Sequence, residues 1–137
     1  MTVRRGGPRD LSAIGGIQHA SPEAAQWNPA EYLEHHLWVA EREGQVAGFL
    51  VARTPAPGEC EILTVAVAPR YRRQGIARTL FAALLSDFRG TIYLEVRPSN
   101  EIARKFYKSL GFDELTIRAA YYQSPPEPAI VMKFHSC

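Results

Sequence analysis

The chain has 137 residues, of which 46% are hydrophobic and 22% charged, and its formal net charge at pH 7 is +2. This composition is that of a single soluble globular domain, and the small net charge argues against a protein that coats nucleic acid. Because no apolar run approaches ~20 residues, and no apolar core follows the N-terminal charges, we expect neither a membrane span nor a signal peptide. The two cysteines, Cys60 and Cys137, have no metal-ligand spacing, nor do the four histidines. We therefore expect a reduced, cytoplasmic protein without a bound metal.

The first half of the chain is predicted to form strands and two helical segments. Asn28-Pro29 indicates a helix start, because asparagine caps a helix and proline suits its first position. Residues 42–45 indicate a hairpin turn, and the proline and glycine residues of 54–58 indicate a loop. In chain order, the predicted elements are a strand at Thr2–Arg5, a helix from Pro8 to Gln18, a helix over Ala30–His36, and strands at Leu37–Glu41 and Val46–Arg53.

Strands and helices alternate in the second half. Pro69 ends a strand because proline has no N–H for the ladder, and Gly111 is a candidate left-handed helix stop. Residues 124–128 are predicted to be a loop. The predicted elements are a strand at Cys60–Val67, a helix at Ile76–Phe88, a strand at Thr91–Val96, a helix at Asn100–Leu110 with Ile102, Phe106 and Leu110 on one face, and strands at Phe112–Ala119 and Ala129–Phe134. The pattern predicts a mostly antiparallel sheet with helices on its faces and one central β-α-β unit.

A basic turn, Arg70–Ala77, lies between a predicted strand and a predicted helix. The first N–H groups of a helix have no intrahelical partner, and the helix dipole makes this end positive. Such an end binds phosphate, and Gly75 lets a phosphate approach the backbone closely. The alternative is an ordinary basic turn whose glycine serves only the backbone dihedral.

The sequence Arg72-Arg73-Gln74-Gly75-Ile76-Ala77 fits the Arg/Gln-x-x-Gly-x-Gly/Ala signature of the GNAT acetyltransferase superfamily, with Ala77 at a position that is often glycine. Ala66–Pro69 before it and Asn100–Phe112 after it fit the same superfamily. Four segments further resemble the ribosomal-protein-alanine N-acetyltransferase (RimI-type) subfamily: Leu94–Asn100, Phe106–Phe112, Ile117–Tyr122 and Ala129–Met132. Residues 18–37 match only around Gln26-Trp27. The resemblance implies one α/β domain over residues 1–137: a GNAT fold with a twisted, mostly antiparallel sheet of about six or seven strands, a splayed central parallel pair and about four helices.

The same resemblance implies that acetyl-CoA is the cosubstrate. The cofactor-binding candidates are Val65, Val67, Arg72, Arg73, Gln74, Gly75, Ile76, Ala77 and Asn100. Main-chain amides of the loop would hold the pyrophosphate, and Arg72 or Arg73 would add a charge-assisted bond, unless these side chains point to solvent. Backbone groups of Val65 and Val67 would bind the pantetheine arm as an added strand does. Asn100 would donate a hydrogen bond to that arm; the alternative is a helix cap.

Acetyl transfer needs a neutral amine and a protonated leaving thiol. Glu95, inside an apolar strand, is the candidate base; the alternative is an edge-strand glutamate that faces solvent or pairs with Arg97. Tyr107 is the candidate acid, because its phenol, with a reference pKa near 10, can protonate a thiolate of pKa about 8.5. By periodicity alone Tyr107 is a half-buried core aromatic.

The resemblance thus implies an N-acetyltransferase acting on a protein N-terminal α-amine, expected to be that of a ribosomal protein, by direct attack on the thioester. Two alternatives stay open at this point: acetylation of a small-molecule amine, and a non-catalytic acyl-CoA sensor. We expect a monomer or weak dimer that contacts neither nucleic acid nor membrane.

Overall fold

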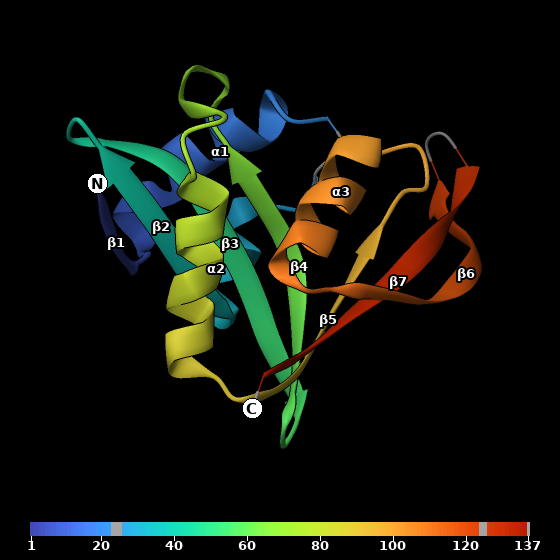
Figure 1. Ribbon diagram of the computed structural model, residues 1–137. Coiled ribbons are helices and arrows are strands. Elements are labelled where there is room, and N and C mark those ends of the chain that lie inside the picture. The colour runs from blue at the N-terminus through green and yellow to red at the C-terminus, as the bar shows by residue number, and fades with distance from the viewer. Residues whose placement is uncertain (23–25, 124–125, 137) are drawn as a thin grey trace. The chain divides into compact units, whose positions relative to one another are not determined.

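The computed structural model describes residues 1–22, 26–123 and 126–136. The β-strands pair in the order β1-β2-β3-β4-β5-β7-β6, and β4 and β5 are parallel. The predicted mixed sheet with one parallel pair is therefore confirmed. In chain order (Figure 1), with η for 3-10 helices, the elements are β1 (Thr2–Arg5), η1 (Pro8–Asp10), α1 (Leu11–His19), η2 (Pro29–Glu34), β2 (His36–Arg42), β3 (Gln45–Ala56), β4 (Glu59–Val67), η3 (Pro69–Tyr71), α2 (Ile76–Asp87), β5 (Gly90–Val96), α3 (Glu101–Leu110), β6 (Asp113–Gln123) and β7 (Pro126–Ser136).

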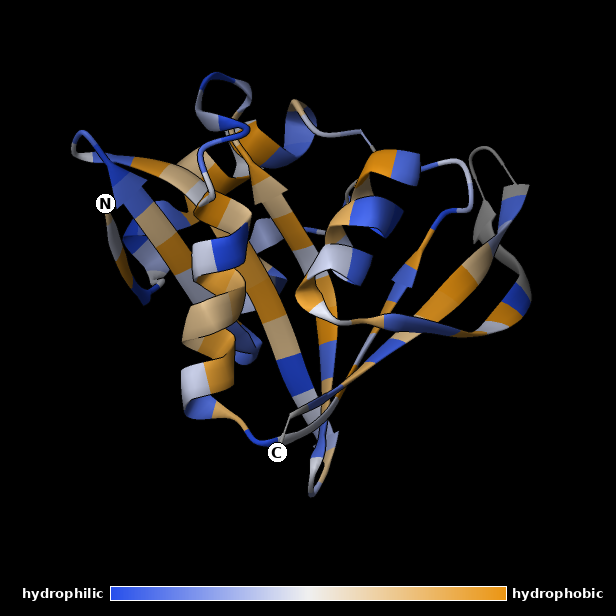
Figure 2. Cartoon of the chain, in the orientation of Figure 1, coloured by the Kyte–Doolittle hydropathy of each residue, from blue (hydrophilic) through white to orange (hydrophobic). Residues whose placement is uncertain are grey.

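The chain divides into two compact units, Met1–Arg53 with Ile62–Phe88, and Thr54–Glu61 with Arg89–Cys137. In the first unit, side chains of α1 and η2 pack on one face of β2 and β3. The buried cluster on this face is Ile14, Ile17, Tyr32, Leu37, Val39, Phe49, Val51 and Ala66. Hydrophobic residues accordingly dominate β3 in Figure 2, where most of the strand is orange. Alternate residues of a strand face opposite ways, so the other face of these strands is left for α2, which contacts β2.

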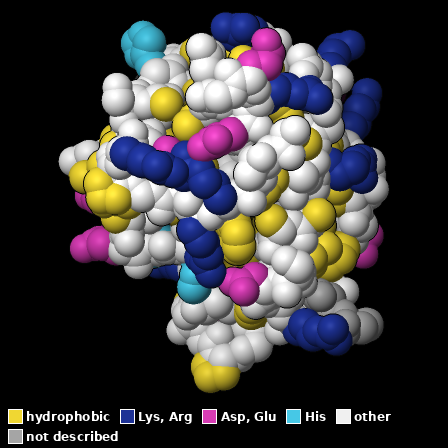
Figure 3. Space-filling model, turned by 90° about the vertical axis from the view of Figure 1, so that its left-hand side faces the viewer, with side chains coloured by type: hydrophobic (Ala, Val, Ile, Leu, Met, Phe, Trp, Pro, Cys, Tyr) yellow, Lys and Arg dark blue, Asp and Glu magenta, His cyan; other side chains and the backbone are white. Residues whose placement is uncertain are grey.

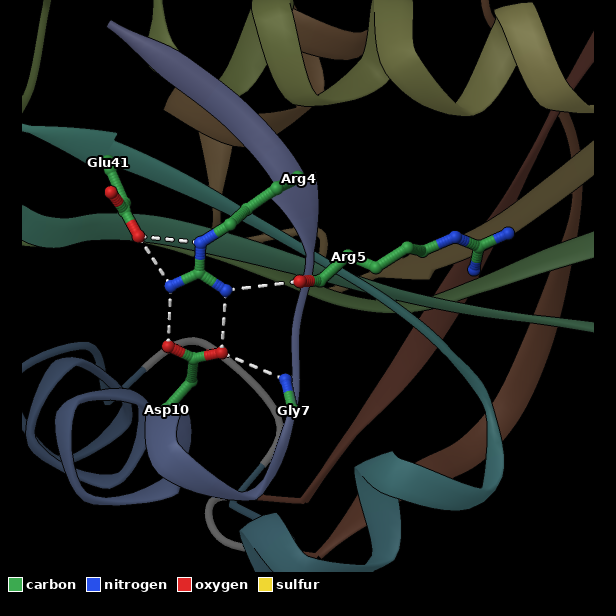
Figure 4. Close-up of polar contacts among 5 residues, drawn as sticks. All are labelled: Arg4, Arg5, Gly7, Asp10 and Glu41. Atoms are coloured by element: carbon green, nitrogen blue, oxygen red, sulfur yellow. Dashed lines mark hydrogen bonds and ion pairs between the residues drawn. The ribbon is translucent and has the colours of Figure 1, made fainter.

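A buried ion-pair cluster joins β1, η1 and β2 in the same unit (Figure 4). Arg4 donates from both terminal nitrogens to the Asp10 carboxylate, at 2.9 and 2.8 Å, and from Nε to Glu41 at 2.6 Å. The backbone N–H of Gly7 also donates to Asp10, whose side chain is only 3% exposed. Hydrogen bonding from Arg4 holds the pKa of the Asp10 carboxyl below its usual value, against the opposing effect of burial.

In the second unit, β5 pairs with β7 from Gly90↔Ser136 to Val96↔Ile130, and β7 pairs in turn with β6. The parallel ladder between β4 and β5 contains three residue pairs, from Glu59↔Thr91 to Glu61↔Tyr93. The separation of β4 from β5 beyond these residues stays a prediction. Gly111 ends α3 at φ 110°, and a Cβ there would lie 3.0 Å from the Phe134 ring, so both the backbone angle and the packing require glycine.

Several predicted boundaries are wrong, for local reasons. The expected helix at 30–36 is the 3-10 helix η2, which ends at Glu34, and β2 already begins at His36. The expected loop at 54–58 is shorter, because β3 runs to Ala56; residues before proline favour extended backbone, so Pro55 and Pro57 do not prevent this. β6 and β7 are longer than predicted, and of the expected loop at 124–128 residues 124–125 lie outside the described residues.

The packing face of α3 also differs from the prediction. Ile102 was expected to share a buried stripe with Phe106 and Leu110, but its side chain is 81% exposed. The apolar and aromatic residues that are partly covered are Ala103, Phe106, Tyr107 and Leu110, a stripe rotated by one position. Among the described residues, no helix combines the length and the apolar character needed to cross a membrane.

Candidate active site

The predicted site residues fall into two groups. The loop before α2 and the end of β4 belong to the first unit, whereas Glu95, Asn100 and Tyr107 belong to the second. Each group is described by itself.

The loop before α2 has the backbone of an anion-binding turn. Gly75 is the residue before the helix, with φ 78° and ψ 12°, and no side chain caps this helix end. Arg73 also has a positive φ, 64°, which is uncommon for a residue with a side chain. A Cβ built on Gly75 meets no atom within 4 Å, so the space above the loop is open. The first N–H groups of α2, at Ile76 and Ala77, therefore lack a side-chain acceptor from the cap, as a phosphate site requires.

Arg72 contacts the protein through its side chain. Its Nε donates to the Val67 carbonyl at 3.0 Å, and Nη2 donates to the Ala20 carbonyl and the Ser21 hydroxyl at 3.3 and 3.0 Å. The guanidinium thus links the end of β4 to the end of α1. Gln74 accepts a hydrogen bond from Arg42 and donates to the Arg70 carbonyl. The loop is held from several sides by side chains, which leaves its backbone amides for a ligand.

Val65 and Val67 are half-buried residues of β4 and alternate with the buried Ile62, Thr64 and Ala66. Both therefore point away from the covered side of the strand. The Val67 carbonyl accepts the Arg72 bond described above, and a carbonyl oxygen has a second lone pair for another donor. Their backbone bonds to a pantetheine arm stay a prediction.

Gly75→Val is expected to weaken the binding of coenzyme A about 10- to 100-fold, the effect of losing one or two bonds to a charged group. A β-branched side chain is strained at φ 78° and would occupy the open space where a phosphate approaches the amides. Isothermal titration of coenzyme A measures this effect.

Gly58→Val is the matched control, because Gly58 has φ 75° and an equally open Cβ position but lies in the turn between β3 and β4. Both variants should lose similar stability, and only Gly75→Val should lose affinity. Equal affinities of the two variants for coenzyme A would contradict the binding of phosphate by this loop.

Residues after α1, the region that matched the resemblance least, are tied together by side-chain amides. Gln18 donates to the Trp27 carbonyl at 2.6 Å and accepts from the Tyr32 hydroxyl, while Gln26 donates to the Ser21 carbonyl at 3.1 Å. Burial raises the pKa of Tyr32 to about 12, so its hydroxyl remains a donor across the physiological range. Residues 23–25 of this segment lie outside the described residues.

Glu95 lies on β5, which pairs with β4 and β7 and so is not an edge strand. Its side chain is 15% exposed, and its Oε1 accepts a hydrogen bond from Arg118 at 2.9 Å. Its Oε2 is buried and has no hydrogen-bond partner among the described residues. The alternative of an edge-strand glutamate that faces solvent is therefore wrong, and Arg97, its other alternative partner, donates to Glu127 at 3.0 Å. A buried carboxylate oxygen without a partner is costly, and such groups occur where a ligand or water completes the site.

Tyr107 is half-buried on α3 in an aromatic cluster. Its ring centroid lies 5.6 Å from that of Phe106 and 5.8 Å from that of Phe112. The ring of Tyr107 therefore packs as the periodicity predicted for a half-buried aromatic. The role of its hydroxyl as the acid stays a prediction.

Glu95 and Tyr107 lie on opposite faces of this part of the sheet. Ile92 and Glu95 differ by three positions on β5, so they face opposite ways. Phe134 lies directly opposite Ile92 on β7 and so shares its face, and the Phe134 ring is 5.4 Å from that of Phe112. Because Tyr107 packs on Phe112, it belongs to the face of Ile92.

Asn100 caps α3, with its Oδ1 accepting the Ala103 N–H at 3.2 Å. The neighbouring Ser99 donates from its N–H and its hydroxyl to Glu127. Arg97 donates to the same carboxylate at 3.0 Å, and this bond holds the pKa of Glu127 below its usual value. The turn that leads into α3 is thereby fixed to β7, and the bond of Asn100 to pantetheine stays a prediction.

Comparison with known proteins identifies the family. The model of the Acetyltransferase (GNAT) family matches residues 11–112. The chain is 36% identical over 133 residues to the [ribosomal protein bS18]-alanine N-acetyltransferase of Escherichia coli K12, which covers 90% of this chain and 89% of that protein. This chain belongs to the GNAT acetyltransferase family. It is thus an N-acetyltransferase that resembles the RimI type, as predicted.

Two solved structures share the fold of this chain. Ard1 from Thermoplasma volcanium superposes with a TM-score of 0.89 at 28% identity, and the match covers 99% of this chain and 97% of that one. Naa20 from Chaetomium thermophilum, solved with a bisubstrate analogue, superposes with a TM-score of 0.86 at 26% identity, covering 99% and 87%. The fold expected from the resemblance is confirmed.

GNAT acetyltransferases use acetyl-CoA as the acetyl donor, and the loop before α2 fits it. The open space at Gly75 and the uncapped helix end offer amides to a pyrophosphate. Basic side chains on the face shown in Figure 3 lie among acidic and hydrophobic ones and do not form one continuous patch. Among the described residues, no group of three or more His, Cys, Asp or Glu side chains has the arrangement of a metal site.

Sequence reasoning missed the partners of the site residues in this GNAT domain. Arg118 and Glu127 lie 23 and 30 residues from the groups they bind, so only the register of β5, β7 and β6 brings them together. Alternating polar positions on β6 were the available signal. Cys60 was expected to be a buried strand residue and not a nucleophile; it is fully buried, and this burial raises its pKa to about 11.

Proposed function

We propose that this enzyme transfers the acetyl group of acetyl-CoA to the α-amine of a protein N-terminus, and that a ribosomal protein is the acceptor. The Oε2 of Glu95, buried and without a hydrogen-bond partner in the described part of the chain, is the observation that supports this chemistry most directly. The names of the relatives support the acceptor: the Escherichia coli protein is a ribosomal-protein-alanine N-acetyltransferase, and it matches nearly the whole chain.

In this proposal, acetyl-CoA is held through its pyrophosphate by the amides of residues 73–77. Val65 and Val67 bind its pantetheine arm through the backbone, Asn100 adds a hydrogen bond, and Arg72 or Arg73 adds positive charge. The Arg72 side chain already bonds Val67, Ala20 and Ser21, so Arg73 is the better candidate for a side-chain contact.

Glu95 acts as the base. An α-amine has a reference pKa near 8 and a lysine amine one near 10.4, so an α-amine needs less help to reach its neutral form at pH 7. Oε2 of Glu95 removes the ammonium proton, directly or through water, and the amine nitrogen attacks the thioester carbon.

Tyr107 completes the transfer. As the carbon–sulfur bond breaks, the tyrosine hydroxyl gives its proton to the departing thiolate, and the second proton lost by the attacking nitrogen restores the hydroxyl as the amide forms, directly or through water. No acyl-enzyme is needed, in keeping with the burial of Cys60.

A peptide panel tests this function. Acetyl-CoA and the enzyme are mixed with a peptide that begins with free alanine, the same peptide blocked at its α-amine but containing lysine, and a set of small amines; release of free thiol is followed. We expect thiol only with the free α-amine. Turnover confined to small amines would mean that the acceptor is a small molecule and not a protein N-terminus. Binding of acetyl-CoA without thiol release in every mixture would indicate a sensor.

A further inference from the structure

The two oxygens of the Glu95 carboxylate have different surroundings. Nη1 of Arg118 donates to Oε1 at 2.9 Å, whereas Oε2 is buried with no partner among the described residues. We infer that Arg118 is a positioning residue for Glu95, holding Oε1 so that Oε2 is the oxygen that receives the proton of the acceptor amine. This inference rests on the proposed role of Glu95 as the base.

Strand register explains how Arg118 reaches Glu95 from a different strand. Glu95 lies opposite Val131 on β7, and Val131 lies opposite Thr116 on β6. Because side chains alternate, Arg118 shares the face of Thr116 and hence that of Glu95. The register of β6 shifts between Arg118 and Tyr122, so Arg118 is the last residue of the regular ladder. A long side chain at this position spans β7 and ends at the carboxylate.

No other described arginine of this face takes the same place. Arg97 lies two residues beyond Glu95, just after β5 ends at Val96, and it donates to Glu127 at 3.0 Å. Lys133 lies opposite Tyr93 on β7, two residue pairs from the pair of Glu95 and Val131, and is itself exposed. Arg118 is therefore the cation that the structure joins to the base.

The exposure of the two partners separates positioning from stabilisation. The Arg118 side chain is 61% exposed, and the Glu95 side chain 15%. Ion pairs with an exposed partner contribute little to the free energy of folding, because solvent screens their attraction and hydrates the charge when the pair is broken. An exposed arginine that orients a covered carboxylate should thus matter for turnover far more than for stability.

Chemical rescue of Arg118→Ala tests the inference in the full chain. We expect kcat to fall about 10- to 100-fold, the loss that follows from one bond to a charged group, with the KM for acetyl-CoA unchanged and the melting temperature nearly unchanged. Millimolar guanidinium should restore part of kcat, because the vacated position is open to solvent. Sodium chloride at the same ionic strength should not.

Glu114→Gln is the matched control, since Glu114 is also on β6 and also forms an ion pair, with Arg104 at 3.0 Å. Guanidinium should not raise its kcat. Arg118→Lys, which keeps the charge without the planar fork, should fall between wild type and Arg118→Ala. In the double variant Glu95→Gln/Arg118→Ala, kcat should be no lower than in Glu95→Gln alone, because Arg118 then has no base to orient.

The outcomes distinguish this inference from the proposed function. Loss of turnover in Glu95→Gln with full turnover in Arg118→Ala, or with a loss that guanidinium does not repair, overturns the positioning role and leaves the base in place. Full turnover in Glu95→Gln would show that Glu95 is not the base, and the inference about Arg118 would then fail as well.

Discussion

Tyr107→Phe is expected to lower kcat about 100-fold or more while the Kd for acetyl-CoA changes little. Phenylalanine keeps the ring that packs between Phe106 and Phe112 and removes only the hydroxyl. Without that proton donor the thiolate must leave unprotonated.

Steady-state thiol release with an alanine-starting peptide, together with titration calorimetry of acetyl-CoA, measures both quantities. Tyr93→Phe is the matched control, because it also removes a hydroxyl from a half-buried tyrosine of the same unit. Its kcat should stay near that of wild type. If Tyr107→Phe turns over at the wild-type rate across the pH range, another group or water protonates the thiolate.

Arg4→Met is expected to lower the free energy of unfolding at pH 7 by about 3 kcal/mol, the usual cost of removing one partner from a buried ion pair. Asp10 would remain 3% exposed and would keep only the Gly7 N–H of the bonds in Figure 4. A buried carboxylate with one donor is under-compensated, and methionine supplies no other. Urea unfolding followed by circular dichroism measures the change.

The same pair predicts how stability depends on pH. Because the bond from Arg4 lowers the pKa of folded Asp10 below its unfolded value near 3.9, the stabilisation is fully present above about pH 4. It is lost as the pH falls through the folded pKa and the carboxyl becomes protonated. The stability gap between wild type and Arg4→Met should therefore narrow below about pH 4.

Arg5→Met is the control for the neighbouring position. Arg5 pairs with Asp87 at 2.7 Å, but both side chains are about half exposed, and its guanidinium also lies 4.3 Å from the Trp38 ring. Its loss should cost about 1 kcal/mol at pH 7. Equal costs at the two positions would mean that burial of Asp10 adds nothing to the strength of its ion pair.

The local chemistry of the chain was sufficient to predict the loop that we assign to the phosphates. Gly75 has a left-handed backbone and α2 begins at Ile76, as predicted. The prediction needed only neighbouring residues: a proline that ends a strand, and a glycine before an amphipathic run. The stop of α3 at Gly111 and the cap at Asn100 were predictable for the same reason. These features depend on backbone angles and on bonds between residues a few positions apart.

Tertiary structure alone decided which groups meet the predicted site residues. Arg118 binds Glu95 because three strands align in one register, and Arg72 turns to Ser21, 51 positions away, because α1 ends near β4. The exposed Ile102 shows the same limit on a helix, since the stripe that packs depends on where the sheet lies. Sequence periodicity specifies that a face is apolar, whereas the partner across that face is chosen by strand pairing and packing between distant segments.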